Sequence, residues 1–320
     1  MLAALISCSA SILIKSYEEK SFLSWMRQSN QFFTGDDYHF RLGIFISNLR
    51  NVQNFNSVGK SFRVSLNQFS CCTPSEYNLL LGRLSTSSKN YLNRKFDTKA
   101  YKGELPDTVD WRSKGIVNVV KDQGQCGSCW AFGTIQACES AFALSYGHLF
   151  SCSEQNLVDC CTYCSGCSGG SESQALLYII RYQDGFLNSE SDYPYTAIDG
   201  TCSFDQTKAI NKISSYINGE RFDENNLKLL VSNGVCIIAI DASKWSFQMY
   251  SGGIYDEPSC SSSKIGHSVG LVGYGTENGI DYWLVRNSWG ENWGENGYIR
   301  MSRNKDNQCG VATDPLQVQA

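Results

Sequence analysis

The chain has 320 residues, of which 42% are hydrophobic and 18% are charged, and it contains only 5 prolines. This composition indicates a globular protein with one large domain or two modest ones, and it excludes disordered, collagen-like and coiled-coil chains. No apolar run reaches the roughly 18 residues that a membrane-spanning helix needs. A net charge of −4 argues against binding of nucleic acid.

Charge and cysteine are both unusual in this chain. Residues 1–104 contain 13 Lys or Arg and 7 Asp or Glu, a net charge of +6, whereas residues 105–320 contain 14 and 24, a net charge of −10. Two parts of opposite charge are expected to attract each other. The 15 cysteines are an odd number, so an oxidising compartment would leave at least one thiol unpaired.

Residues 1–14 are mostly apolar, with small residues near Ala10. This pattern resembles the hydrophobic region of a secretory signal peptide, although the usual positive charge in front of it is missing. The alternative is a buried amphipathic start of the folded protein. A signal peptide would place the protein in the secretory pathway, where disulfides can form.

The next segment predicts a helix, then an extended stretch and a linker. Seven residues recur at steps of three and four, which places them on one helical face: Asp37, Arg41, Ile44, Phe45, Asn48, Val52 and Asn56. Because this face mixes Arg and Asn with aromatic residues, its polar members need fixed partners. Residues 65–69 are expected to be extended, and the polar residues 83–104 to form an exposed linker. Pro106 marks the start of a new unit.

Residues 121–132 contain the first motif that carries chemistry, Lys-Asp-Gln-Gly-Gln-Cys-Gly-Ser-Cys-Trp-Ala-Phe. Cys129 precedes one helical stripe, after which Gly147 is expected to end the helix; the stripe consists of Ala131, Ile135, Cys138 and Phe142. Cys129 then lies in the first helical turn, where the helix dipole and the free N–H groups favour the reactive thiolate.

The chain has three histidines, and one of them has a suitable context to assist this thiolate. His267 lies in a strand-like run, and a second strand-like run, residues 282–286, ends at Asn287. An Asn side-chain oxygen can fix the orientation of an imidazole, and Trp289 can shield that hydrogen bond from water. A nucleophile, a base and an orienting group are the parts that nucleophilic catalysis needs.

These motifs resemble those of papain-family cysteine proteases, nearest to the cathepsin L type. The matching segments keep the family order: residues 123–130, 153–157, 166–170 and 287–290. The resemblance implies an α+β, papain-like fold of two lobes, a helical lobe at about 114–215 and a β-barrel lobe at about 216–320. Together they form the peptidase unit 105–320, for which we expect no cofactor and no metal.

The resemblance also implies a role for each catalytic residue. Cys129 attacks the peptide carbonyl. His267 holds the thiolate as an ion pair and then protonates the leaving amine, while Asn287 orients His267. The Gln123 side-chain amide and the Cys129 backbone N–H form the oxyanion hole.

Residues 15–104 resemble the inhibitory propeptide of the same family. The predicted helical face matches the interrupted helical motif of cathepsin L-type propeptides, with Asp37 where Glu is usual. A second propeptide motif is matched at Asn67 and Phe69, while Ser65 and Cys71 replace its usual Gly and Asp. That Asp is associated with pH sensing in the family, and the thiol of Cys71 is not expected to take this role.

The propeptide is expected to run through the cleft and block it. Maturation would cut near Glu104–Leu105. Acid would protonate carboxylates, weaken the attraction between the +6 and −10 parts, and favour release of the propeptide.

Family spacing implies three disulfides, Cys126–Cys167, Cys160–Cys202 and Cys260–Cys309. Three further cysteines adjoin apolar residues and are expected to be buried thiols: Cys138, Cys152 and Cys236. Cys161 and Cys164 form a Cys-x-x-Cys-x-x-Cys spacing with Cys167, which iron–sulfur proteins also use. We favour an extra local bridge, Cys161–Cys164 or one to another spare cysteine, over a metal site.

The second substrate subsite, S2, sets specificity in this family. Ten positions match the substrate-binding residues: Ser171, Glu172, Ile238, Ala239, Ile265 and Asp314 for S2, Gly169 and Gly170 for the substrate backbone, and Trp289 and Trp293 for the leaving-group side. Asp314 falls at the floor of S2, where its carboxylate would pair bidentately with a guanidinium, and Glu172 near the rim adds attraction. We therefore expect Arg to be accepted at P2, the residue second before the cut. The alternative is that Asp314 points to solvent and S2 takes Leu or Phe.

The sequence thus predicts a cysteine endopeptidase that is made as an inactive precursor in the secretory pathway, for a lysosome-like vesicle or the outside of the cell. Its expected partners are protein and peptide substrates, its own propeptide and cystatin-like inhibitors, and we expect a monomer. The alternative is a catalytically inactive relative that serves as a binding protein. Four intact positions argue against that alternative: Cys129, His267, Asn287 and Gln123.

Overall fold

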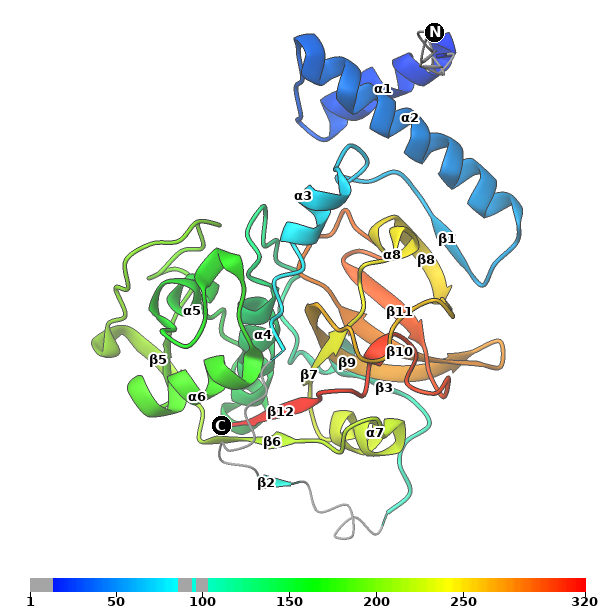
Figure 1. The fold of residues 1–320 in the computed structure, drawn as a ribbon. Coiled ribbons are helices and arrows are strands. Elements are labelled where there is room, and N and C mark those ends of the chain that lie inside the picture. The colour runs from blue at the N-terminus through cyan, green and yellow to red at the C-terminus, as the bar shows by residue number, and fades with distance from the viewer. Residues whose placement is uncertain (1–13, 86–93, 96–102) are drawn as a thin grey trace, which may run out of the picture.

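The computed structural model describes residues 14–85, 94–95 and 103–320. The predicted signal segment up to residue 13 and most of the predicted linker lie outside these residues. Helices α1 and α2 project from the main body, and the chain then passes through α3 and runs down between two lobes (Figure 1). One lobe is mainly helical and the other is built on a sheet, so the expected α+β two-lobe architecture is confirmed.

Helices α1 (Ser16–Gln28) and α2 (Gly35–Ser57) pack through aromatic side chains. The ring of Phe45 lies 5.3 Å from that of Phe22 and 5.7 Å from that of Trp25, between centroids. Each ring removes a large apolar area from water, so this cluster holds the two helices together. The predicted helix over residues 37–56 is confirmed with slightly wider bounds.

The polar residues on α2 have the fixed partners that the sequence requires. Arg41 donates from Nη1 and Nη2 to the two carboxylate oxygens of Glu76 in α3 (Pro74–Leu79), both at 2.6 Å. Asn56 donates to the Val64 carbonyl at 2.8 Å and accepts from the Val64 N–H at 3.1 Å. Helix α2 therefore positions both the short strand and the helix that follow it.

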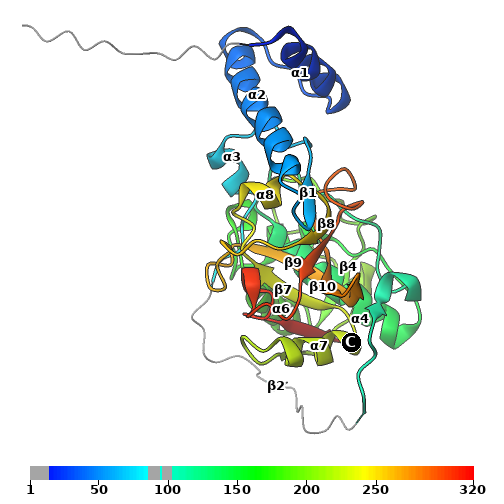
Figure 2. The same ribbon diagram turned by 90° about the vertical axis from the view of Figure 1, so that its right-hand side faces the viewer.

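The helical lobe is built around α4 (Cys129–Tyr146), which is buried on all its faces as far as Ala143. The predicted apolar stripe is correct but too narrow, because other helices and the sheet cover the remaining faces of α4 (Figure 1). In the view of Figure 2 the sheet lobe lies in front of the helical lobe. Gly147 ends the helix at a φ of 73°, a left-handed conformation that favours glycine. The other elements of this lobe are α5 (Glu154–Cys160), α6 (Glu172–Tyr182), β4 (Phe186–Asn188) and β5 (Ala209–Lys212).

The second lobe is a mostly antiparallel sheet that carries a large apolar core. Its hydrogen-bonded order is β1-β8-β11-β10-β9-β7-β12-β6-β2, with β3 beside β9. Helices α7 (Glu224–Ser232) and α8 (Trp245–Gln248) pack against it. The strands from this part of the chain are β3 (Val109–Asp110), β6 (Ser215–Asn218), β7 (Cys236–Ile240), β8 (Tyr250–Tyr255), β9 (His267–Glu277), β10 (Ile280–Arg286), β11 (Tyr298–Ser302) and β12 (Leu316–Gln319).

The first part of the chain adds a strand at each end of this sheet. β1 (Phe62–Val64) pairs antiparallel with β8, and β2 (Arg94–Lys95) pairs parallel with β6. Such backbone pairing uses the free edge groups of a sheet and fixes the position of the added chain. Between these strands, Arg83 is only 8% exposed. The prediction of an exposed linker is therefore wrong at its start, because Arg83 has charged partners between the lobes.

Within the described ranges, no helix combines the length and the apolar character that crossing a membrane requires. The domain and lobe boundaries expected from the sequence stay predictions.

Candidate active site

Cys129 is the first residue of α4, directly after Ser128, and it is fully buried. Burial raises the pKa of its thiol to about 12, although hydrogen bonds from the backbone of Ser268 and Gly82 act in the opposite direction. The thiolate expected at this helix N-terminus is therefore disfavoured while the cleft is covered. Gly82 belongs to the segment that runs between the lobes, so that segment itself excludes water from the sulfur.

His267 opens strand β9 and is also fully buried. Its Nε2 lies 2.8 Å from Oδ1 of Asn287, which directly follows β10. Because an amide oxygen only accepts hydrogen bonds, Nε2 carries the proton and Nδ1 has a free lone pair. Within the described part of the chain, Nδ1 has no hydrogen-bond partner. Burial lowers the pKa of this imidazole to about 4, despite the opposing effect of Asn287.

Trp289 lies against the imidazole of His267. The two ring centroids are 4.7 Å apart and the ring planes meet at 30°. The same indole contacts Phe69 and Tyr77, at 5.1 and 5.7 Å between centroids. Trp293 packs edge-on against Trp289 at 5.2 Å and is fully buried in the sheet core. The first part of the chain thus reaches the aromatic wall that was expected on the leaving-group side.

Gln123 donates from Nε2 to the Leu80 carbonyl at 2.9 Å and to the Cys126 carbonyl at 2.8 Å. Leu80 belongs to the covering segment, residues 79–85, which runs between the lobes. A peptide carbonyl of this segment therefore accepts a hydrogen bond from the Gln123 amide that is expected to serve the oxyanion hole. Ser288 orients this amide, because its Oγ donates to Gln123 Oε1 at 2.7 Å. Ser288 is not among the residues predicted from the sequence, although its position between Asn287 and Trp289 indicates a place in the site.

Tyr195 is a second residue that the sequence did not single out. Its hydroxyl donates to the Gln123 carbonyl at 2.8 Å and lies 2.6 Å from Oγ of Ser128. Tyr195 therefore ties together the two ends of the loop that precedes Cys129. The contacts join residues 72 and 67 positions apart, so no local sequence signal marks this role.

The covering segment, residues 79–85, pairs with the glycines expected to receive a substrate backbone. Gly170 donates to the Gly82 carbonyl at 2.9 Å and accepts from the Leu84 N–H at 2.7 Å. These bonds form a parallel bridge between Gly170 and Arg83. A Cβ on Gly169 would lie 2.7 Å from the Gly82 carbonyl oxygen, so the close approach requires glycine.

Gly82 packs against the turn that precedes α4. A Cβ on Gly82 would lie 1.8 Å from the Gly127 carbonyl oxygen, which leaves no room for any other residue. The Gly82 backbone also hydrogen-bonds to Cys129 and lowers its pKa, an effect that only a donor has. Gly82 is therefore a direct neighbour of the Cys129 sulfur.

The side chain of Arg83 enters the expected S2 subsite. Its Nε lies 3.2 and 3.3 Å from the two carboxylate oxygens of Glu172, and its Nη2 lies 2.9 Å from Oδ2 of Asp314. Its Nη1 donates to the Ile265 carbonyl at 3.3 Å. The Arg83 guanidinium thus spans two carboxylates and a carbonyl, while the bidentate pair expected between Asp314 and a P2 arginine stays a prediction. The other oxygen of Asp314 lies 3.1 Å from Nη2 of Arg221.

The neutral residues assigned to S2 do not all face the same side. Ser171, Ala239 and Ile265 are buried, and Ile265 contributes its carbonyl to Arg83. Ile238 packs in the core of the sheet lobe. Side chains alternate along a strand, so Ala239 points away from that core. Ile238 and Ala239 therefore face opposite sides of β7, and their assignment to S2 stays a prediction.

Two family models match this chain. The model for papain family cysteine proteases matches residues 105–319, and the model for the cathepsin propeptide inhibitor domain matches residues 22–77. The chain belongs to the papain family of cysteine proteases. The papain-family unit carries the cleft, and the covering segment directly follows the propeptide inhibitor domain.

Relatives of this papain-family protease cover nearly its whole length. Cysteine proteinase 3 of Dictyostelium discoideum is 42% identical in an alignment of 308 positions that covers 93% of this chain and 90% of that protein. Digestive cysteine proteinase 1 of Homarus americanus is 41% identical in an alignment of 291 positions that covers 87% of this chain and 88% of that protein. The solved structure of digestive procathepsin L2 from the larval midgut of Tenebrio molitor superposes with a TM-score of 0.90 at 34% identity and covers 95% of this chain and 100% of that one.

These relatives are named as proteinases and precursors, and they give no support to an inactive binding protein. The protein is a cysteine protease with an inhibitory propeptide.

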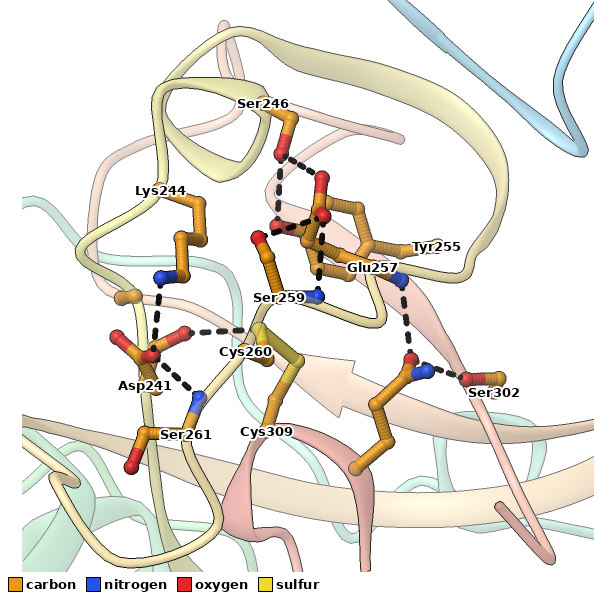
Figure 3. Close-up of a disulfide and its surroundings, with 12 residues drawn as sticks. Asp241, Lys244, Ser246, Tyr255, Glu257, Ser259, Cys260, Ser261, Ser302 and Cys309 are labelled. Atoms are coloured by element: carbon orange, nitrogen blue, oxygen red, sulfur yellow. Dashed lines mark hydrogen bonds and ion pairs between the residues drawn. A yellow bond between two sulfur atoms is a disulfide. The ribbon is translucent and has the colours of Figure 1, made fainter.

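Among the described residues the papain-family protease has three disulfides, at the pairs that the resemblance implied: Cys126–Cys167, Cys160–Cys202 and Cys260–Cys309. Figure 3 shows the third of these, which joins the loop before Ile265 to the segment that leads to Asp314. Asp241 braces the same loop by accepting from the Ser261 N–H at 2.7 Å. This disulfide therefore links the two backbone segments that carry Ile265 and Asp314, both expected to belong to S2.

The predicted extra bridge between Cys161 and Cys164 is not formed, since both are free thiols. Their side chains instead hydrogen-bond to each other. The three cysteines expected to be buried thiols are buried and free: Cys138, Cys152 and Cys236.

Proposed function

We propose that this papain-family protease hydrolyses peptide bonds with Cys129 as nucleophile, His267 as acid and base, and Asn287 as the group that orients the imidazole. The 2.8 Å contact between His267 Nε2 and Asn287 Oδ1 carries the proposal. It places the ring proton on Nε2, so that Nδ1 can accept the proton of a thiol. The indole of Trp289 lies against this ring and limits the access of water to it.

Departure of the propeptide lets water reach the cleft, and the thiol proton then moves to Nδ1 of His267. The Cys129 thiolate attacks the carbonyl carbon, and the oxyanion accepts hydrogen bonds from Gln123 Nε2 and the Cys129 N–H. One such donor contributes about 3–4 kcal/mol to the transition state. His267 gives its proton to the leaving amine, and it later takes a proton from the water that hydrolyses the thioester.

The propeptide opposes this chemistry electrostatically as well as sterically. With the cleft covered, the pKa of Cys129 is raised to about 12 and that of His267 is lowered to about 4, in both cases chiefly by burial. Near neutral pH both groups are therefore uncharged. The thiolate–imidazolium pair needs the water that the propeptide excludes.

Arg at P2 is the second part of the proposal. The support comes from Arg83, whose guanidinium is held by Glu172, Asp314 and a backbone carbonyl. Lys carries a single point charge and cannot reach all three partners at once, so Arg should be preferred over Lys. A neutral P2 residue would leave the Glu172 carboxylate, whose side chain is 3% exposed, without a cation inside the subsite.

Hydrolysis of matched peptides tests both parts. The precursor is activated in acid, and kcat/KM is measured for peptides that differ only in having Arg, Lys or Leu at P2. We expect the order Arg, Lys, Leu, a lower Arg/Leu ratio for Asp314→Asn, and no activity for Cys129→Ala. An Arg/Leu ratio unchanged by Asp314→Asn would contradict the P2 preference alone. Full activity of Cys129→Ala would contradict the thiolate mechanism.

The setting that we propose is the secretory pathway, in a lysosome-like vesicle or outside the cell, with a monomeric enzyme acting on proteins and peptides. Support comes from the cathepsin propeptide domain and from relatives named as digestive proteinases. Cystatin-like inhibitors fit the same cleft once the propeptide has left. Cell fractionation with detection of the mature form tests this setting, and mature enzyme found solely in the cytosol would contradict it.

A further inference from the structure

Asp314 is shared between two guanidinium groups, one on each carboxylate oxygen. Oδ2 lies 2.9 Å from Nη2 of Arg83, and Oδ1 lies 3.1 Å from Nη2 of Arg221. Arg221 also donates from Nε to the Thr313 carbonyl at 3.1 Å, and its guanidinium lies 5.3 Å from the ring centroid of Phe222. Arg83 belongs to the propeptide part of the chain, whereas Arg221 belongs to the peptidase unit. Arg221 therefore stays beside Asp314 after maturation.

The charges at S2 give Arg221 a distinct effect. Glu172 and Asp314 supply two negative charges and Arg221 supplies one positive charge, so the empty subsite has a net charge of −1. An Arg at P2 brings this total to zero. Without Arg221 the empty subsite would have a charge of −2. This charge would attract a guanidinium more strongly, and a neutral side chain would bind less favourably beside two carboxylates without a cation.

We infer that Arg221 sets the strength of the preference for Arg over neutral residues at P2, by offsetting part of the charge of Asp314. The inference rests on the proposed P2 preference and deepens it. Arg221 pairs with Asp314, so it acts on the P2 residue through that carboxylate. Its side chain is 62% exposed, and exposed ion pairs are weak. Its removal should therefore raise the Arg/Leu ratio by about two- to fivefold.

The experiment compares the acid-activated wild-type enzyme with Arg221→Gln, Arg221→Lys and Arg112→Gln. Arg112 is the matched control, because it is an exposed arginine of the peptidase that pairs with Asp110. Arg112→Gln changes the net charge of the protein by the same amount as Arg221→Gln, whereas Arg221→Lys leaves the net charge unchanged. The readout is the ratio of kcat/KM for two peptides that differ only in Arg or Leu at P2, at low and at high salt.

Arg221→Gln should raise the Arg/Leu ratio and make it fall more steeply with salt, while Arg221→Lys and Arg112→Gln should stay close to the wild type. An unchanged or lower ratio for Arg221→Gln would overturn the inference, as would an equal rise in Arg112→Gln. A rise in both Arg221→Gln and Arg221→Lys would also overturn it, because the shape and not the charge of the side chain would then matter.

Asp314→Asn in the same series separates this inference from the proposed function. If Asp314→Asn lowers the ratio and Arg221→Gln does not raise it, the role of Arg221 fails and the P2 preference stands. If Asp314→Asn leaves the ratio unchanged, the P2 preference itself fails.

Discussion

The precursor with Arg83→Ala should open its cleft far more often than the wild type. Breaking a buried ion pair by removing one partner costs about 3–5 kcal/mol. The Arg83 and Glu172 side chains are 5% and 3% exposed, but Asp314 is 25% exposed and keeps Arg221. We therefore reduce the expected cost to about 2–4 kcal/mol. At about 1.4 kcal/mol for each factor of ten, the equilibrium constant for opening should rise about 30- to 700-fold.

Alkylation of Cys129 measures this opening, because the residue is fully buried while the propeptide is in place. The precursor is treated at neutral pH with a small alkylating reagent for increasing times. Peptide mass spectrometry quantifies labelled Cys129 separately from the other free thiols. When the cleft closes faster than the reagent reacts, the labelling rate is proportional to the opening constant. Arg83→Ala should then be labelled faster by the same factor.

Two variants give this experiment its controls. Arg63→Ala removes an exposed arginine from β1 of the propeptide and should be labelled at close to the wild-type rate. Arg83→Lys keeps the charge without the planar fork and should fall between the wild type and Arg83→Ala. A rate for Arg83→Ala within about fivefold of the wild type, the range of an exposed ion pair, would refute the reasoning.

Three further predictions concern the propeptide and the catalytic pair. Gly82→Ala should also speed the labelling of Cys129, because its Cβ would lie 1.8 Å from the Gly127 carbonyl oxygen; a wild-type labelling rate would contradict this contact. The pKa of Glu76 is lowered from 4.5 to about 2, chiefly by its hydrogen bonds with Arg41. The Glu76–Arg41 pair therefore stabilises the precursor fully at pH values above about 4.5, and this stabilisation is lost as the pH falls through about 2. Glu76→Gln should therefore lower the Tm of the precursor at neutral pH but not near pH 2, and equal Tm values at neutral pH would count against it. Asn287→Ala should lower kcat/KM by on the order of 10- to 100-fold, which is part of the rate enhancement that acid–base catalysis supplies. Activity equal to that of the wild type would contradict the orienting role of Asn287.

The structure shows one contact through which the two oppositely charged parts of the chain attract each other. The +6 and −10 parts meet at Arg83, which joins the propeptide to Glu172 and Asp314. Cys71 stands where the family commonly has an Asp, and burial raises the pKa of its thiol. Cys71 therefore stays neutral in acid and cannot release the propeptide by titrating, which agrees with the expectation drawn from the substitution.

Local signals explain why much of the site could be predicted from the sequence. The glycine-rich turn before Cys129, the strand-like run that contains His267 and the position of Asn287 after a second strand each depend on a few neighbouring residues. Helix ends and strand ends are set by short-range hydrogen bonding and steric limits on the backbone. Recognition of the family motifs then supplied the roles, the disulfides and the subsite.

Contacts between distant residues had to come from the tertiary structure. Arg83 meets Glu172 and Asp314 across 89 and 231 positions, and the sequence had placed it in an exposed linker. The side of β7 that faces S2 depended on how the strand is registered in the sheet. The protonation of Cys129 depended on the segment that covers it. The sequence by itself determined which chemical groups are present and where the backbone turns. Only the tertiary structure decided which charges meet and which groups lose their water, because pairing and burial are set by chain segments that no local signal brings together.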